Sequence, residues 1–327
     1  RDAQLTLYLY GAAGQLVASK SKSIAPLGYE QQPLLSLFNL TDPLPGAALK
    51  LVLGVGSDVG VNVSVVDNRS GDASLGSNEP PPTGDVLVIP GIARLAGEAG
   101  TNWRSSLYFT NPAESPKAFE LTLVKKDGSK KPRYLSLQSK ETWAIEDAVA
   151  WVYGDDPVPS AVAGVLKVQA DAGRLPVVTA RTFNLAQDGG TYGQNLKAFH
   201  AGNSAGGGTA YRKLYLAGIS TEDIARSNLG FVHVGGGTVN FKVWFYDEAG
   251  NLLNPGGQPY TVALSASRPW DQDKLENRFR NKGWTPPVNQ WAIGAVIEVE
   301  GGMGQAYVSV IDNLTGDPTL IPAVPAP

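Results

Sequence analysis

The sequence predicts an all-β protein built from tandem Ig-like β-sandwich repeats, one incomplete and two complete. Apolar and polar residues alternate in segments such as 5–10, 119–123 and 239–245, as they do in half-buried strands. Gly (38 residues) and Pro (23 residues) are plentiful, and charged residues make up only 17% of the 327. This composition suits short strands joined by many turns, and the length suggests two or three domains.

A strand followed by a similar turn occurs three times along the chain. Residues 61–72 recur as 306–317, and both segments end in the pattern Asp-Asn-x-x-Gly-Asp. A third version, 175–184, ends in the same Asn but has a different turn after it. Self-similarity of this kind indicates a repeat architecture. A hairpin signal precedes each version, and its glycine is Gly14, Gly128 or Gly250.

We predict three units and name them by their order. Unit one is an incomplete repeat at 1–79, unit two is a complete repeat at 84–203, and unit three is a complete repeat at 210–327 with an extended C-terminal tail. The prolines in 77–84 predict a stiff, extended spacer. The glycines in 203–209 predict a flexible linker.

Each unit is expected to contain a second hairpin and one short helix. In unit one this hairpin joins strands 49–53 and 61–66 through a turn at 56–58, where Gly or Asp permits a positive φ. Its counterparts are expected to turn at 171–173 and 301–304. The helical candidates are 33–38, 141–152 and 271–280.

Unit one lacks the two strands with which the other units begin. Unit two starts with strands 86–95 and 107–111, and unit three with strands 213–219 and 229–234, whereas unit one starts directly at its first hairpin. A sandwich without these strands exposes core side chains and an unpaired edge, which natural proteins normally avoid.

Three explanations for the missing strands stay open. A neighbouring copy could add an extended segment to the open edge, and head-to-tail repetition of that contact would build a filament. The missing strands could instead lie upstream in a longer protein. Unit one could also be a reduced but self-sufficient domain.

The first explanation leads to a set of expected interface residues. The segment 319–324 is apolar and extended, and is therefore a candidate donor strand for a homo-polymer. The residues expected at the interface are Leu5, Leu7 and Leu9 of the first strand, Thr319, Leu320, Ile321 and Val324 of the tail, and the aromatic residues Trp270 and Trp284.

Catalysis is not expected from this sequence. Cys is absent, and the two His residues, His200 and His233, have no partner nearby in the sequence. The glycine runs lack the Lys-Ser/Thr of a phosphate loop. The turns 67–72 and 312–317 bring oxygen ligands together, but they do not match a calcium loop and are expected to cap themselves. We therefore expect no catalytic residue, no cofactor and no metal.

The composition also bears on partners and location. The net charge of −3 offers no reason to expect nucleic acid or an anionic membrane as a partner. No apolar run approaches the roughly 20 residues that span a bilayer. The chain starts with Arg1 rather than Met, which would fit the removal of a signal peptide.

Several motifs resemble those of uncharacterised secreted bacterial β-sandwich repeat proteins. The motifs are Trp103 to Leu107 and its repeat Arg226 to Leu229, Ala180 to Asn184, Gly190 to Gln194, and Asp312 to Pro318. The likeness covers nearly the whole chain. It implies an exported, extracellular or cell-surface location and a structural or adhesive role, and it implies no catalytic residues.

The seven Trp residues support an alternative function. Trp143 and Trp151 lie on one helical candidate, and Trp270, Trp284 and Trp291 surround another. Aromatic side chains could stack on sugars, which makes a carbohydrate-binding surface adhesin the alternative, although such residues commonly pack cores. The leading prediction is a non-enzymatic structural protein that assembles into a cell-surface or extracellular filament or layer through β-strand complementation between copies.

Overall fold

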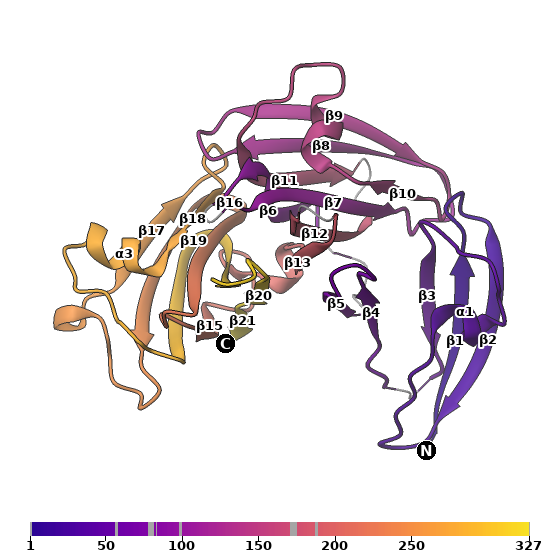
Figure 1. Ribbon diagram of the computed structural model, residues 1–327, viewed down its shortest axis with the longest axis horizontal. Coiled ribbons are helices and arrows are strands. Elements are labelled where there is room, and N and C mark those ends of the chain that lie inside the picture. Colours follow the sequence, from indigo (N-terminus) through magenta and orange to yellow (C-terminus); the bar gives the residue numbers. More distant parts are fainter. Residues whose placement is uncertain are drawn as a thin grey trace.

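The structure is a computed structural model that describes residues 2–55, 58–77, 82, 84–97, 100–170, 175–186 and 189–326. Antiparallel strands dominate it, which confirms the all-β prediction. The chain forms an arch, with unit two at the top and units one and three as its two sides (Figure 1).

Unit one contains two separate sheets. The first has the order β2-β1-β3, and one face of it packs against the helix α1 through Leu5, Leu7, Leu9 and Phe38. The second is a hairpin of β4 and β5. The elements are β1 (Ala3–Tyr10), β2 (Leu16–Ile24), α1 (Leu34–Phe38), β3 (Ala48–Leu53), β4 (Asn62–Val66) and β5 (Ala73–Ser77).

Unit two encloses its own core between two connected groups of strands. One group runs β9-β8-β11-β6 and the other runs β10-β7-β12-β13, and β6 pairs with β7 where the groups meet. Alternate residues of these strands and one side of α2 fill the core. The elements are β6 (Val86–Ala96), β7 (Asn102–Thr110), β8 (Lys117–Lys125), β9 (Lys130–Leu137), β10 (Thr142–Ile145), α2 (Ala148–Tyr153), β11 (Val162–Ala170), β12 (Val177–Leu185) and β13 (Thr191–Leu196).

Unit three is organised around two long strands, β16 and β19, which pair along most of their length. The shorter strands pair with these two, except that β21 pairs with β15. The elements are β15 (Lys213–Ile219), β16 (Ala225–Tyr246), β17 (Tyr260–Leu264), β18 (Trp270–Lys274), α3 (Leu275–Asn281), β19 (Ile293–Asp312), β20 (Pro318–Pro322) and β21 (Val324–Ala326), preceded by the 3₁₀ turn η3 (Ala201–Asn203) and β14 (Ala205–Gly206), with a second 3₁₀ turn η4 (Pro255–Gly257) before β17.

The predicted second hairpin is wrong. β3 pairs with β1 and β4 pairs with β5, so these consecutive strands belong to different sheets. In unit three, β19 continues through 301–304 as one strand. The register shifts there, and the extra residues lie on β16, where Gly235 pairs with Met303 and Val239 pairs with Gly301. The counterpart turn at 171–173, and residues 56 and 57, lie outside the described residues.

The predicted flexible linker is also wrong. Ala205 and Gly206 form β14, which pairs with β19, and Ala205 is buried in the core of unit three. Glycine is required because a Cβ on Gly206 or Gly207 would lie within 2.2 Å of a carbonyl oxygen of β19. These glycines therefore permit close packing of two backbones rather than flexibility.

The helical candidates are shorter than predicted. The candidate 33–38 is α1, whereas 141–152 and 271–280 each begin as a strand, β10 or β18, before their helix starts. Trp143 consequently lies on a strand, although it still meets Trp151 edge-on with ring centroids 6.0 Å apart.

Units two and three share a buried apolar interface. Phe199 of unit two stacks on Tyr307 of unit three, with ring centroids 6.5 Å apart. Trp270 donates a hydrogen bond to the Tyr307 hydroxyl. The interface consists of Val88, Val124, Val165 and Phe199 from unit two and Val232, Val234, Trp270 and Tyr307 from unit three.

Replacing Phe199 by Ala is expected to destabilise this interface. The ring is fully buried, so its loss leaves a cavity that costs about 3–5 kcal/mol. Calorimetry should then resolve separate transitions for units two and three. Tyr134→Ala removes an exposed ring on β9 and serves as the control. An unchanged single transition in the Phe199 variant would contradict the assignment.

Candidate assembly surfaces

β4 and the end of β19 match in sequence, yet their surroundings differ. Val63 is 49% exposed, whereas its counterpart Val308 is 0% exposed. Val66 is 51% exposed, and its counterpart Ile311 is 6% exposed. In unit three this stretch of β19 lies between β16 and β20. Among the described residues, β4 pairs only with β5, so the side taken by β16 is open.

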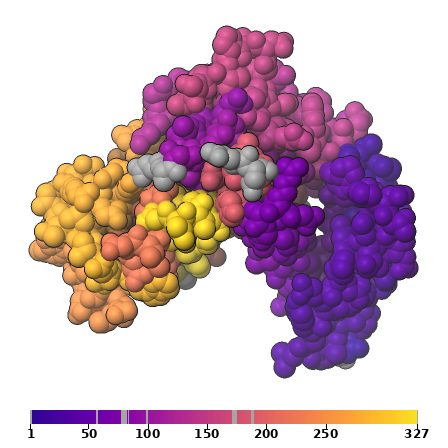
Figure 2. Space-filling view, in the orientation of Figure 1, coloured from indigo at the N-terminus to yellow at the C-terminus, as the bar shows by residue number. Residues whose placement is uncertain are grey.

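The edge of β3 is open in the same way. Its counterparts are β11, which lies between β8 and β6, and the first part of β19, which lies between β16 and β15. In the described part of the chain β3 pairs only with β1, and Val52 and Leu53 are exposed. At the corresponding edges of unit two, β6 pairs with β11 and β7 pairs with β12. Figure 2 shows gaps between the β4–β5 hairpin and the rest of unit one.

The β4–β5 hairpin is held by unit two. The Asp67 carboxylate accepts hydrogen bonds from the backbone and the hydroxyl of Thr191, at 3.0 and 2.5 Å. The Asp72 carboxylate accepts from the Gly193 amide at 2.9 Å and pairs with Arg181 at 2.5 Å. These contacts anchor the hairpin to β12 and β13 rather than to the sheet of β1 to β3.

The Asp turns cap themselves, as the sequence predicted. Asp67 accepts from the amides of Arg69 and Ser70, and Asp312 accepts from those of Leu314 and Thr315. The sequence analysis missed that Asp67 and Asp72 also dock onto unit two. The sequence around the two carboxylates does not indicate this docking, because their partners lie more than a hundred residues away.

Loss of the Asp72 carboxylate should release the hairpin. Asp72→Ala removes the carboxylate that pairs with the Arg181 guanidinium, and charge-assisted hydrogen bonds contribute about 1.5–3 kcal/mol. Amide hydrogen exchange in β5 is expected to rise about 10-fold or more. The control is Asp127→Ala, because Asp127 bonds Ser129 within its own turn. Equal exchange in both variants would contradict the anchoring role.

The contact between the β4–β5 hairpin and unit two should persist at mildly acidic pH. The hydrogen bond from Thr191, followed by that from Arg69, lowers the pKa of Asp67 to about 2. A lowered pKa contributes stability above the unfolded value of 3.8 that is lost as the pH falls through about 2. The docking contribution of Asp67 is therefore fully present at neutral and mildly acidic pH.

Turns from all three units contribute charges around Arg181. Burial, and then the charge of Asp72, raise the pKa of Asp317 to about 6, while Arg181 lowers it and Asp312 raises it. One buried oxygen of Asp317 has no hydrogen-bond partner in the described structure. Ionised Asp317 therefore opposes the approach of the unit three turn to the unit one turn.

Asp317→Asn should stabilise the protein at pH 7. The pKa of Asp317 is raised from its usual value of 3.8 to about 6 in the folded protein. With respect to this group, the wild type is therefore most stable below pH 3.8 and loses stability as the pH rises to about 6. After allowance for screening at this partly exposed group, we expect a gain of about 1 kcal/mol at pH 7. Denaturation at pH 4 and pH 7 measures it, and an equal effect at both would contradict the account.

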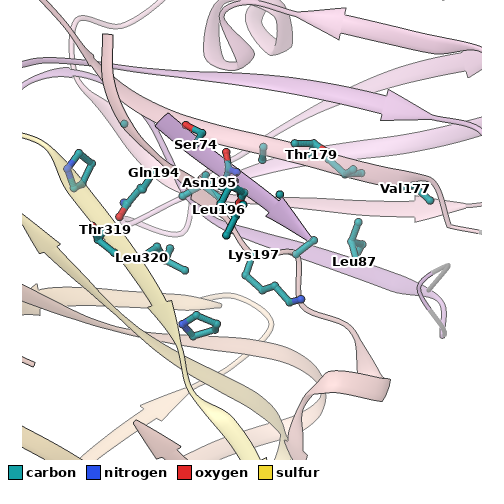
Figure 3. A pocket seen from close by; sticks show the side chains of 18 of the residues that line it. Ser74, Leu87, Val177, Thr179, Gln194, Asn195, Leu196, Lys197, Thr319 and Leu320 are labelled. Atoms are coloured by element: carbon teal, nitrogen blue, oxygen red, sulfur yellow. Dashed lines mark hydrogen bonds between the residues drawn. The ribbon is translucent and has the colours of Figure 1, made fainter. Parts of the chain in front are cut away.

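A cleft of about 490 Å³ lies where β5, β13 and β20 approach one another. These strands occupy equivalent positions in the three units. Ser74, Gln194 and Leu320 are among the side chains that line it (Figure 3). Its lining mixes hydroxyl, amide and apolar groups with the side chains of Lys197 and His200.

The histidines have structural partners. The His200 side chain accepts from the Gly202 amide and caps η3. His233 is buried on β16, its Nε2 lies 2.9 Å from the Gly237 carbonyl oxygen, and burial lowers its pKa.

Within the residues that the structure describes, no cluster of three or more His, Asp or Glu side chains could hold a metal ion. No helix in that part of the chain is long and apolar enough to cross a membrane.

The predicted interface residues outside the C-terminal tail lie in three different places. Leu5, Leu7 and Leu9 are buried beneath α1. Trp270 lies in the interface between units two and three, and Trp284 packs on Phe279 and Tyr260 in unit three.

The predicted donor segment is engaged within its own unit. Thr319, Leu320 and Ile321 belong to β20 and pair with β19, and Val324 begins β21 and pairs with Tyr215 of β15. Val324 is nevertheless exposed. The segment closes unit three in this conformation, so it would have to leave its neighbours before pairing elsewhere.

No family model matches the chain, and no curated protein matches it. Among solved structures, Thermotoga maritima 1070 is 9% identical, with 36% of this chain and 91% of that chain covered and a TM-score of 0.25. A lectin from Pleurotus ostreatus in complex with GalNAc is 6% identical, with 81% of each chain covered and a TM-score of 0.20. A tetra-tandem repeat from the extending region of a large adhesion protein is 13% identical, with 98% and 66% covered and a TM-score of 0.15. These similarities are too low to indicate a function.

Proposed function

We propose that this chain is a non-enzymatic, exported structural protein. It is a subunit of a cell-surface or extracellular filament or layer, in which β-strands from a neighbouring copy complete unit one. The observation that carries the proposal is the exposure of β4, whose counterpart in unit three is buried between two strands.

The side chains of β4 suit a buried environment. Val63, Val65 and Val66 follow the pattern that Val308, Val310 and Ile311 follow in unit three. Burying apolar area stabilises by about 25 cal/mol per Å², so three exposed valines on one short strand favour any partner that covers them. Unpaired strand edges act as templates for a further strand.

The required donor must reach two edges. In unit two, β6 pairs with β11, which is the counterpart of β3, and β7 pairs with β12, which is the counterpart of β4. A donor therefore places one strand beside β3 and another beside β4. Backbone hydrogen bonds would supply much of the affinity, and the exposed valines would select apolar side chains on the donor.

Lysines on β4 should prevent this assembly. Val63→Lys/Val65→Lys introduces two charges on a face that complementation would bury, while the free chain tolerates them because both positions are exposed. Light scattering should find large species for the wild type and particles near 34.5 kDa for the variant.

The control for this experiment is Tyr134→Lys/Val288→Lys, which adds the same charge at two exposed positions elsewhere. The control should assemble as the wild type does. A monodisperse wild-type monomer, or β4 variants that assemble normally, would contradict the proposed function.

A further inference from the structure

The strand β12 of unit two has an open stretch along one of its edges. Within the described part of the chain, residues 177–179 pair with β7 on one side, whereas the pairing with β13 on the other side begins only at Ala180. Successive residues of an antiparallel strand direct their backbone groups to alternate neighbours. At least one of the residues 177–179 therefore points its N–H and C=O groups to the open side.

The counterparts of this stretch in units one and three are covered by the strand that follows them. When the three repeat segments are aligned on the Asn that they share, Thr179 corresponds to Val63 and Val308. Val63 pairs with β5, and Val308 pairs with β20. The corresponding strand of unit two, β13, ends at Leu196 and so does not reach Thr179.

β13 ends early because the residues after it are held in the interface between units two and three. The backbone N–H and C=O of Phe199 both bond with Val88 of β6, at 2.8 Å each. The Phe199 ring packs against Tyr307 of unit three. The chain that could have continued along β12 is consequently directed away from it.

The open stretch of β12 lines the cleft of about 490 Å³. Small-ligand sites commonly have volumes of about 300–1,000 Å³. Leu87, Leu196 and Leu320 supply apolar side chains to the lining. Thr179 and Thr319 supply hydroxyl groups from β12 and β20 (Figure 3). The cleft thus offers an unpaired strand edge together with apolar and polar side chains.

The strands seated at the two counterpart edges indicate which occupant fits. Residues 73–77 of unit one and 318–322 of unit three contain only small, apolar or hydroxyl side chains and carry no charge. In the cleft of unit two, Lys197 contributes a cation, and the described lining residues include no Asp or Glu. An uncharged segment therefore suits the cleft better than a basic one.

We infer that this cleft binds an extended, uncharged peptide segment of a partner protein, which adds a strand to the open edge of β12. Main-chain hydrogen bonds to residues 177–179 hold the segment, and the leucines of the lining receive its apolar side chains. The added strand continues the line of β13. The site lies in unit two and does not depend on the completion of unit one.

A capped peptide with the sequence of residues 318–323 is the probe, because this segment covers the counterpart stretch of β19. Calorimetric titration should show saturable binding to the wild type, and hydrogen exchange of the amides within 177–179 should slow. The absence of saturable binding would overturn the inference.

A matched peptide with N-methyl groups on the backbone of its Leu and Ile tests the role of the strand edge. It keeps both side chains, but it loses two donors, of which one faces β12 in an added strand. Its dissociation constant should be about 10-fold higher or more. Equal affinities of the two peptides would contradict strand addition.

Thr179→Arg/Thr319→Arg narrows the cleft from two sides, at exposed positions that should not affect folding. This cleft variant should bind the peptide about 10-fold more weakly or worse. Thr238→Arg/Thr285→Arg makes the same changes at two exposed positions outside the cleft and should bind as the wild type does. Equal affinities of the cleft variant and this control would place the peptide elsewhere and overturn the inference.

The β4 variant Val63→Lys/Val65→Lys separates this site from the open edges of unit one. If only the β4 variant loses the peptide, the peptide binds unit one and the inference is overturned. If the wild type self-associates without peptide and the cleft variant stays monomeric, a second copy occupies the cleft, which also overturns it. Peptide binding in the cleft of a wild type that stays monomeric supports the inference and contradicts the proposed function.

Discussion

Backbone pairing on both sides of the central strands is the constraint on which the described architecture depends. A buried amide or carbonyl without a partner is costly, so interior strands need neighbours on both edges. In unit three, β16 and β19 satisfy each other over most of their length, and shorter strands complete the remaining edges. In the described part of unit one, β3 and β4 each have one neighbour. The apolar residues on β4 remain exposed as a result.

Unit two is the centre around which the other units are organised. It buries Val88 and Phe199 against unit three and binds the β4–β5 hairpin of unit one through Thr191 and Arg181. The hairpin is consequently held away from the sheet of β1 to β3 by polar contacts rather than by a shared core. This separation leaves two edges accessible while keeping them in a defined position. An acceptor for strands needs both properties.

Sequence patterns predicted the strands that alternate in period two, whereas the absence of two strands from unit one stays a prediction from the comparison of the units. Both depend on local composition and on repetition within the chain. The errors occurred where glycine permits opposite outcomes. Gly206 and Gly301 resemble linker and turn residues, but each allows the backbone of a neighbouring strand to approach closely. Only the position of the neighbouring strand distinguishes these outcomes.

The candidate site was predictable only in part, for the same reason. The open edges followed from a count of strands. The docking of Asp67 onto Thr191 depends on contacts between distant segments, and so does the pairing of Val324 with Tyr215. The aromatic side chain of Trp270 suggested an exposed platform for a sugar. Its place between two units follows instead from the packing of unit two on unit three.

Electron cryomicroscopy of the purified native assembly tests the central claim most directly. The account predicts density for two additional strands in unit one, one beside β3 and one beside β4, continuous with a neighbouring copy. Density in which both edges face solvent, or in which residues of the same copy fill them, would contradict it.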